Sequence, residues 1–246
     1  MSVTGEADGP PLRAGPPIGD LIWGLNAALG ICATLVRRGR TGRGDTVGAS
    51  LNSAMISMLG FLAANCLATG EQPARTANDH AIVSPYGMFR TADGEVAIAP
   101  SSEAVYYRLL DAIGAPELRD HPNFRSNDDR VRNRRAMNAA IEERLKAASR
   151  DYWIKKLNTA GVPCDRVMTL PEIFTDPQTL DQQMVVSVGH PGHGEVKMLG
   201  FPIKFSEAPC RVRRPAPDLG TDTDAVLREL GYSAEEIACL HAAGIV

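Results

Sequence analysis

The chain has 246 residues, enough for one large domain or two small ones, and its 44% hydrophobic and 22% charged residues are typical of a folded protein. A net charge of −3 and an aromatic content of 5% give neither the basic surface nor the stacking side chains of a nucleic-acid-binding protein. The five cysteines are never spaced as C-x-x-C, so they predict free thiols in a reducing cytoplasm, with no disulfide and no metal site.

A loop rich in glycine and proline is predicted for residues 1–19, which contain neither the basic nor the apolar segment of a signal peptide. The loop ends at Asp20, a residue type that often caps a helix and whose charge the helix dipole stabilises. The apolar residues 21–36 predict a buried helix, because they leave almost no polar face. This run is shorter than a membrane span and contains Gly24 and Asn26, so no membrane partner is expected.

Arginines and glycines at residues 37–44 predict the end of this helix and a turn. Such a cluster can hold a phosphate, but the spacing is not that of a phosphate-binding loop, so a solvated helix end is the favoured interpretation. A short strand over residues 46–50 and a second apolar helix over residues 51–67 are expected next.

The rest of the chain predicts small sheets and short helices. An Asp-Gly turn at residues 93–94 predicts a hairpin of strands 86–90 and 95–99. Serines at 101 or 102, at 126 and at 149 predict the starts of helices that run to about residue 113, over 127–148, and up to Gly161. The remaining predictions are a strand over 162–168, helices over 170–175 and 177–183, strands over 184–188 and 195–199, and two C-terminal helices, the last with a capping box at Ser233.

Few residues outside Asp20 are candidates for chemistry. No phosphate-binding loop, dinucleotide fingerprint or serine-nucleophile elbow is present. His190 and His193 lie in a Pro/Gly turn without a partner pair at metal spacing, which favours solvent-exposed turn residues over ligands. The arginines between residues 130 and 135 are expected on the solvent face of their helix. The pattern alone leaves Asp20 as either a structural cap or a covalent nucleophile.

A resemblance to a known family favours the second interpretation. The motifs that carry it are Gly19-Asp20, Arg40-Thr41-Gly42-Arg43-Gly44, Pro85-Tyr86-Gly87, Thr91-Ala92-Asp93-Gly94, Ala160-Gly161-Val162-Pro163, Gly200-Phe201-Pro202-Ile203-Lys204-Phe205-Ser206 and Leu219-Gly220. In the order and spacing of these motifs, the whole chain resembles the class III CoA-transferases, which include formyl-CoA transferases, carnitine-type CoA transferases and the related α-methylacyl-CoA racemases.

The resemblance implies an α/β fold that is incomplete at its N-terminus, because the chain starts partway through the family pattern. Residues 1–75 would carry the catalytic loop and linker helices of a large CoA-binding domain. Residues 76–200 would form a small α+β domain, and residues 201–246 would form a C-terminal segment with helices that returns to the large domain. In the family, two protomers interlock, so a homodimer is expected. Without the preceding half, the apolar helices over residues 21–35 and 51–67 would expose faces that invite association.

The resemblance also implies an acyl-CoA:carboxylate CoA-transferase with Asp20 as the nucleophile. Its carboxylate would form a mixed anhydride and then an aspartyl-CoA thioester, which a carboxylic acid acceptor attacks. Coenzyme A would enter as a thioester substrate and not as a bound cofactor, and no residue of this chain is assigned to its binding.

Two alternatives remain at this stage. A racemase relative would use Asp20 with Glu103 in support and a histidine upstream of Met1, although a first-turn helix carboxylate is the favoured role for Glu103. In the family, a mobile loop at the position of residues 79–85 covers the active site. These residues lack the multiple glycines of the formyl-CoA enzymes, so the resemblance does not extend to formyl-CoA specificity. The second alternative is a non-catalytic fragment that needs a partner polypeptide.

Overall fold

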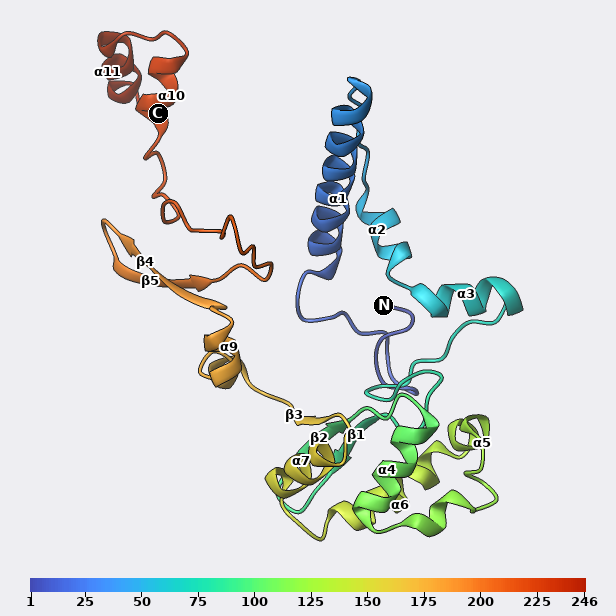
Figure 1. Ribbon diagram of the computed structural model, residues 1–246. Helices are drawn as coiled ribbons and strands as arrows, with labels where there is room; N and C mark the ends of the chain where they lie inside the picture. Colours follow the sequence, from blue (N-terminus) through green and yellow to red (C-terminus); the bar gives the residue numbers. More distant parts are fainter. The chain divides into compact units, whose positions relative to one another are not determined.

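The structure is a computed structural model that describes residues Met1–Val246. It divides into two compact units, Met1–Val167 and Met168–Val246 (Figure 1). Each unit combines helices with one small antiparallel sheet, which is the mixture of elements that the sequence predicts.

The first unit begins with an irregular segment and three helices, α1 (Ile18–Thr41), α2 (Leu51–Ser57) and α3 (Gly60–Thr69). The predicted strand over residues 46–50 is absent. Instead, this segment runs back along α1, where the indole Nε1 of Trp23 donates to the Ala49 carbonyl at 3.0 Å. A Cβ at Gly30 would stand 2.7 Å from Val47 Cγ1, so glycine permits this close approach.

The second predicted apolar helix is two helices. Helices α2 and α3 meet at an angle of 81°, and Gly60 at the bend has a φ of 51°, which favours glycine. The hydrophobic pattern does not show this break because the apolar residues continue through it.

Helix α1 has 24 residues and none of them is buried, so the prediction of a buried helix is wrong for this chain by itself. The length argument against a membrane span is also wrong. Helix α1 is long and apolar enough to cross a bilayer, and α2 with α3 would pass the same test as one bent pair. This statement rests on length and composition alone. A helix that packs against other parts of a protein can have the same length and composition.

The small mixed domain of the first unit has the strand order β1 (Gly87–Arg90), β2 (Glu95–Ile98) and β3 (Cys164–Arg166), all antiparallel. The predicted Asp-Gly turn joins β1 and β2. Val96 and Ile98 of β2 are fully buried while Glu95 and Ala97 are exposed, which is the two-residue alternation of a strand with one covered face.

Helices cover that face. They are α4 (Glu103–Ile113), α6 (Arg134–Leu145) and α7 (Arg150–Thr159). A 3-10 turn, η1 (Pro116–Arg119), follows α4, and a short helix, α5 (Asn127–Arg132), precedes α6. Ser102, Ser126 and Ser149 cap α4, α5 and α7 as predicted. The core contains Phe89, Val96, Ile98, Leu109, Leu110, Met137, Ile141, Leu145, Trp153 and Leu157.

The predicted helix over residues 127–148 breaks at Asn133. The Asn133 side-chain amide donates to the carbonyls of Asp129 at 2.9 Å and Asn123 at 3.3 Å. An asparagine that bonds to nearby backbone groups competes with the helical ladder, and Asn133 separates α5 from α6.

The second unit contains α8 (Leu170–Ile173), α9 (Pro177–Asp181), the hairpin β4 (Val185–His190) and β5 (Gly194–Leu199), and the C-terminal helices α10 (Thr223–Glu229) and α11 (Ala234–Ala242). The predicted capping box at Ser233 is present. Ile237 is the one buried residue of this unit, so local hydrogen bonds and not a core define its elements.

Candidate active site

Asp20 lies in the first turn of α1, where it is the third helical residue. Pro17 occupies the cap position and no side chain caps the helix. The prediction that Asp20 precedes the helix as its cap is therefore wrong, because the cap lies three residues before Asp20. The Asp20 side chain is exposed and makes no hydrogen bond or ion pair in the chain. A structural cap would bond to the backbone; this carboxylate is free.

The surroundings of Asp20 come from α2. A Cβ at the neighbouring Gly19 would lie 3.6 Å from Met55 Sδ, so the start of α1 rests against an apolar side chain. The backbone N–H groups of a first helical turn have no intrahelical acceptor and point toward the helix start. The Ile18 N–H donates to the Pro16 carbonyl at 2.9 Å and the Leu21 N–H to the Pro17 carbonyl at 3.1 Å. The N–H groups of Gly19 and Asp20 therefore remain as the donors that can stabilise a developing oxyanion here.

A second feature of the first unit is a loop, residues 79–84, whose backbone is held by side chains from α5 and α6. Arg134 Nη1 donates to the His80 carbonyl at 2.6 Å. Asn127 donates to the Ile82 carbonyl at 2.8 Å and accepts from the Ser84 N–H at 3.2 Å. The loop is therefore fixed in place by side chains that lie more than 40 positions later in the chain.

Arg130 completes this anchor. Its side chain is buried; Nε donates to the Ser84 carbonyl at 2.7 Å, Nη1 donates to the Phe124 carbonyl at 3.1 Å, and Nη2 pairs with Glu103. Its guanidinium also lies over the Tyr106 ring at 4.1 Å. The fork of five donors of arginine suits such a site, because it can serve several acceptors at once.

The prediction that the arginines of residues 130–135 face solvent is wrong for two of them. Arg132 and Arg135 are exposed, with 70% and 94% of their side chains accessible, but the values for Arg130 and Arg134 are 3% and 14%. Local spacing does not explain this, because Arg130 lies in α5 and Arg134 lies in α6, and both donate to backbone carbonyls of the 79–84 loop. By contrast, the cluster over residues 37–43 is a solvated helix end, as expected, and Arg37 there pairs with Asp45.

Glu103 is the first residue of α4, as expected for a first-turn carboxylate, and its partner is Arg130. Its contacts are within the small mixed domain, and none joins it to Asp20. The structure therefore does not bring together the two carboxylates that a racemase would use.

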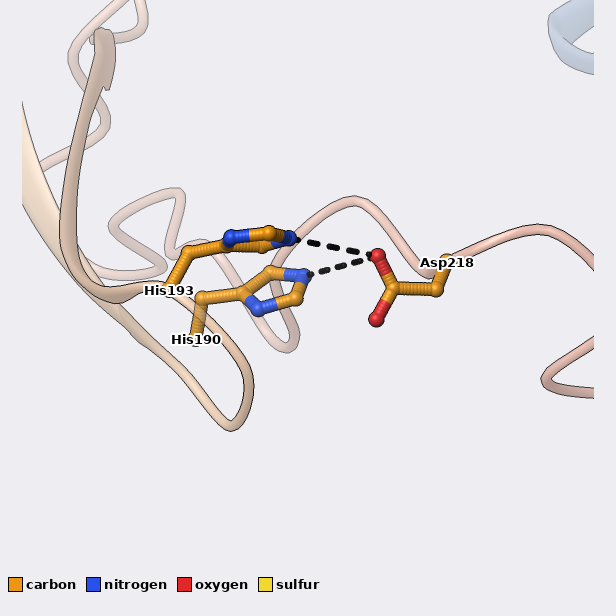
Figure 2. Close-up of side chains that lie close together, drawn as sticks. All are labelled: His190, His193 and Asp218. Carbon is orange, nitrogen blue, oxygen red and sulfur yellow. Dashed lines mark ion pairs between the residues drawn. The ribbon is translucent and has the colours of Figure 1, made fainter.

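His190 and His193 have a partner that their sequence spacing does not reveal. Both rings point at the carboxylate of Asp218, with Nε2 to Oδ1 distances of 4.0 Å and 3.4 Å (Figure 2). Only 9% of the His190 side chain is accessible, so the prediction of two solvent-exposed turn residues is wrong for His190. No local sequence pattern indicates this contact, because Asp218 lies 25 or more positions further along the chain.

The hydrogen bonds of His190 do not favour a cation between these three residues. Its Nδ1 accepts the Gly192 N–H at 3.1 Å, so the neutral ring carries its proton on Nε2, which donates to the Ala216 carbonyl at 3.1 Å. Neither ring nitrogen then has a free lone pair for a metal. The cluster connects the β4–β5 turn to residues 216–218 through the contacts of the two histidines with Ala216 and Asp218.

Comparisons with known proteins identify the family of this chain. The sequence profile described as CoA-transferase family III matches residues 1–223. A succinyl-CoA:glutarate CoA-transferase of Homo sapiens is 30% identical over 247 residues, which cover 100% of this chain and 56% of that protein. An acetyl-CoA:oxalate CoA-transferase of Acetobacter aceti is 33% identical over 231 residues, which cover 93% of this chain and 58% of that protein.

A solved structure supports the fold. A CaiB/BaiF family protein from Brucella suis superposes with a TM-score of 0.74 at 33% identity, over 94% of this chain and 60% of that one. The chain thus spans little more than half the length of the relatives that it matches. The predicted fold class is confirmed, and the chain belongs to CoA-transferase family III.

Proposed function

We propose that this chain supplies the nucleophile and the small mixed domain of an acyl-CoA:carboxylate CoA-transferase, and that Asp20 carries coenzyme A covalently. The observation that carries the proposal is the free, exposed carboxylate of Asp20 in the first turn of a 24-residue helix. Membership of the family and the names of both relatives, each a CoA-transferase, support the reaction class.

The reaction proceeds in two halves. An Asp20 oxygen attacks the thioester carbonyl carbon of the donor, the C–S bond breaks, and a mixed anhydride and the CoA thiolate result. The thiolate attacks the Asp20 carbonyl carbon, which releases the donor acid as a carboxylate and leaves an aspartyl-CoA thioester. The acceptor carboxylate then repeats these steps in reverse order, so a new acyl-CoA leaves and the Asp20 carboxylate is restored. No proton or electron is consumed.

The position of Asp20 suits each tetrahedral intermediate, because negative charge develops on an oxygen next to the first helical turn. The free N–H groups there and the positive end of the helix dipole favour that charge. The carboxylate also has no competing partner within the chain, so it can rotate between the donor and the acceptor.

The acceptor that we propose is a dicarboxylic acid. Glutarate and oxalate, which appear in the names of the two relatives, both have two carboxyl groups. One carboxylate would attack Asp20 while the other would distinguish the substrate from a monocarboxylic acid. A panel of mono- and dicarboxylic acids of equal length tests this point directly.

The relatives contain a further segment that this chain does not match. In this proposal the active assembly includes the polypeptide that corresponds to that segment, either as a further part of the same protein or as a separate chain. The apolar residues of α1, such as Leu25, Leu29 and Val36, are 60% or more exposed and would be covered by that polypeptide. The interlocked homodimer and the cytoplasmic location remain predictions from the sequence. Sedimentation of the assembly tests the first of these.

Trapping the thioester tests the chemistry. The chain, in the assembly in which it is isolated, is mixed with an acyl-CoA and treated with borohydride or hydroxylamine. A thioester at Asp20 becomes homoserine or a hydroxamate, which peptide mass spectrometry locates. Asp20→Asn should abolish both adduct and transfer. Asp151→Asn is the matched control, since Asp151 is also an exposed first-turn aspartate, on α7, and should leave both unchanged.

Two results would overturn the proposal. Transfer without an adduct at Asp20 would exclude the covalent mechanism. Exchange of the α-proton of a branched acyl-CoA with deuterium from solvent, again without an adduct, would assign the chain to the racemase branch instead.

A further inference from the structure

A hollow of about 730 Å³ lies in the second unit, between β4 and the segment 201–212 that follows β5. This volume falls within the range of roughly 300–1,000 Å³ that is typical of small-molecule sites. All of its lining residues belong to the second unit. The hollow is separate from Asp20, which is not among them.

The chain that encloses the hollow is tied to the β4–β5 hairpin at two points. At the first, the Gly200 N–H donates to the Met184 carbonyl at 3.0 Å. A Cβ at Gly200 would stand 1.9 Å from the Gln183 carbonyl oxygen, so glycine is required for this close approach. At the second point, His190 Nε2 donates to the Ala216 carbonyl at 3.1 Å. The two ties therefore lie at opposite ends of β4.

The chain between the ties is much longer than the gap that it bridges. β4 has 6 residues and spans roughly 20 Å at about 3.3 Å per residue. The chain from residue 201 to residue 215 can extend to roughly 50 Å. The segment therefore arches away from β4, and the space between the two is the hollow.

Large apolar side chains line the hollow from both sides. Phe201, Ile203 and Phe205 come from the segment, and Val186 and Val188 come from β4. Ile203 and Phe205 are 63% and 54% exposed, since this unit has no core for them to pack into. Exposed apolar side chains that gather in a concave site are typical of a surface that binds a ligand.

Two cations line the same hollow. Lys204 and Arg211 are exposed, and neither side chain makes an ion pair or a hydrogen bond within the chain. Asp181 is the one acidic residue in the lining, so the lining has one more positive than negative charge. An ammonium and a guanidinium without partners favour a carboxylate, because a charge-assisted hydrogen bond is stronger than a neutral one.

We propose that this hollow binds an amphipathic carboxylate, a carboxylic acid with an alkyl chain. Its carboxylate would lie at Lys204 and Arg211, and its alkyl chain would lie against Phe201, Ile203 and Phe205. A purely polar anion would leave the apolar wall exposed to water, and an uncharged alkane would leave both cations unpaired. The inference concerns the second unit and does not depend on the proposed transferase chemistry.

Octanoate, octan-1-ol and octylammonium make a matched set of probes, because they share an alkyl chain and differ in the charge of the head group. The full chain, labelled with ¹⁵N, is titrated with each while the backbone amide signals of Val188, Lys204 and Arg211 are followed. Octanoate should give saturable shifts at all three. Octan-1-ol should bind about fivefold more weakly, and octylammonium at least tenfold more weakly.

Variants separate the charge from the apolar wall. The double variant Lys204→Gln with Arg211→Gln should bind octanoate about tenfold more weakly and octan-1-ol as before. Phe205→Ala should weaken the binding of both probes. Arg213→Gln is the matched control, because Arg213 is an exposed cation of the same chain segment that does not line the hollow, and it should change nothing. All four substituted side chains are exposed, so the fold should persist.

Three results would overturn the proposal. The first is the absence of a saturable shift with octanoate, as expected if a second copy of the chain fills the hollow. The second is equal binding of octanoate and octan-1-ol, or an unchanged affinity of the double variant for octanoate, which would refute the role of the cations. The third is an equally strong shift at Leu29 of α1, which is also exposed, because octanoate would then adsorb to any apolar surface.

Discussion

Replacing Arg130 with methionine should destabilise the small mixed domain more than any other single change to a charged residue there. Methionine matches the length and the apolar stem of arginine but donates no hydrogen bond. The substitution leaves the carbonyls of Ser84 and Phe124 without the donors that reach them at 2.7 Å and 3.1 Å. It also removes the cation that lies over the Tyr106 ring.

The magnitude follows from these losses. Each buried carbonyl without a partner costs about 1–3 kcal/mol, and the cation over the ring adds about 0.5–1 kcal/mol. Glu103 adds little, because nearly half of its side chain is accessible and water can replace the arginine. We therefore expect a loss of about 3–5 kcal/mol in the free energy of unfolding, the range found when one partner of a buried ion pair is removed.

Urea unfolding followed by fluorescence measures this loss. Trp153 is buried in the core of the domain and Trp23 lies exposed on α1, so a Trp23→Phe background makes Trp153 the one tryptophan and the reporter. Arg132→Met is the matched control: it lies two residues away and is exposed, and it should shift stability by less than about 0.5 kcal/mol. If Arg130→Met costs less than about 1 kcal/mol, or no more than Arg132→Met, the anchoring role of Arg130 is refuted.

Three further predictions concern other parts of the chain. Leu157→Ala, at a fully buried core position, should cost about 2–5 kcal/mol by urea unfolding, and Leu170→Ala, at an exposed position, should cost almost nothing. The pKa of the Cys164 thiol is raised to about 12 by burial, so iodoacetamide should label Cys164 last of the five cysteines. Labelling of Cys164 at the rate of an exposed thiol would contradict its burial in the core of the small mixed domain. The hydrogen bond to Asp224 raises the pKa of His241, so its stabilisation of the α10–α11 pair is complete below the ordinary histidine pKa and is lost as pH rises through the raised value. Asp224→Asn should lower that pKa in an NMR titration, and an unchanged titration curve would exclude the contact.

Local signals in the sequence predicted the starts of three helices and the β1–β2 hairpin correctly, although they missed the breaks within the helices predicted over residues 51–67 and 127–148. Ser102, Ser126 and Ser149 cap helices at the predicted positions, and the Asp-Gly turn makes the predicted hairpin. These features depend on hydrogen bonds between residues a few positions apart, so the residue types suffice to place them. The order of the motifs was also sufficient to identify the family, because the family match over residues 1–223 depends on the sequence alone and not on how the side chains pack.

Only the tertiary structure decided which charged residues are buried and which apolar residues are exposed. Arg130 and Arg134 read as a solvated helix face, but their acceptors are Ser84 and His80, 46 and 54 positions earlier, and no local pattern records such a partner. Residues 21–36 read as a buried helix, but burial needs covering surface on several sides, and α2 with residues 46–50 covers too little of α1 to bury any of its residues. The carboxylate of Asp20 was found by resemblance, whereas its lack of any partner is a property of three-dimensional structure alone, because pairing depends on what the rest of the chain places nearby.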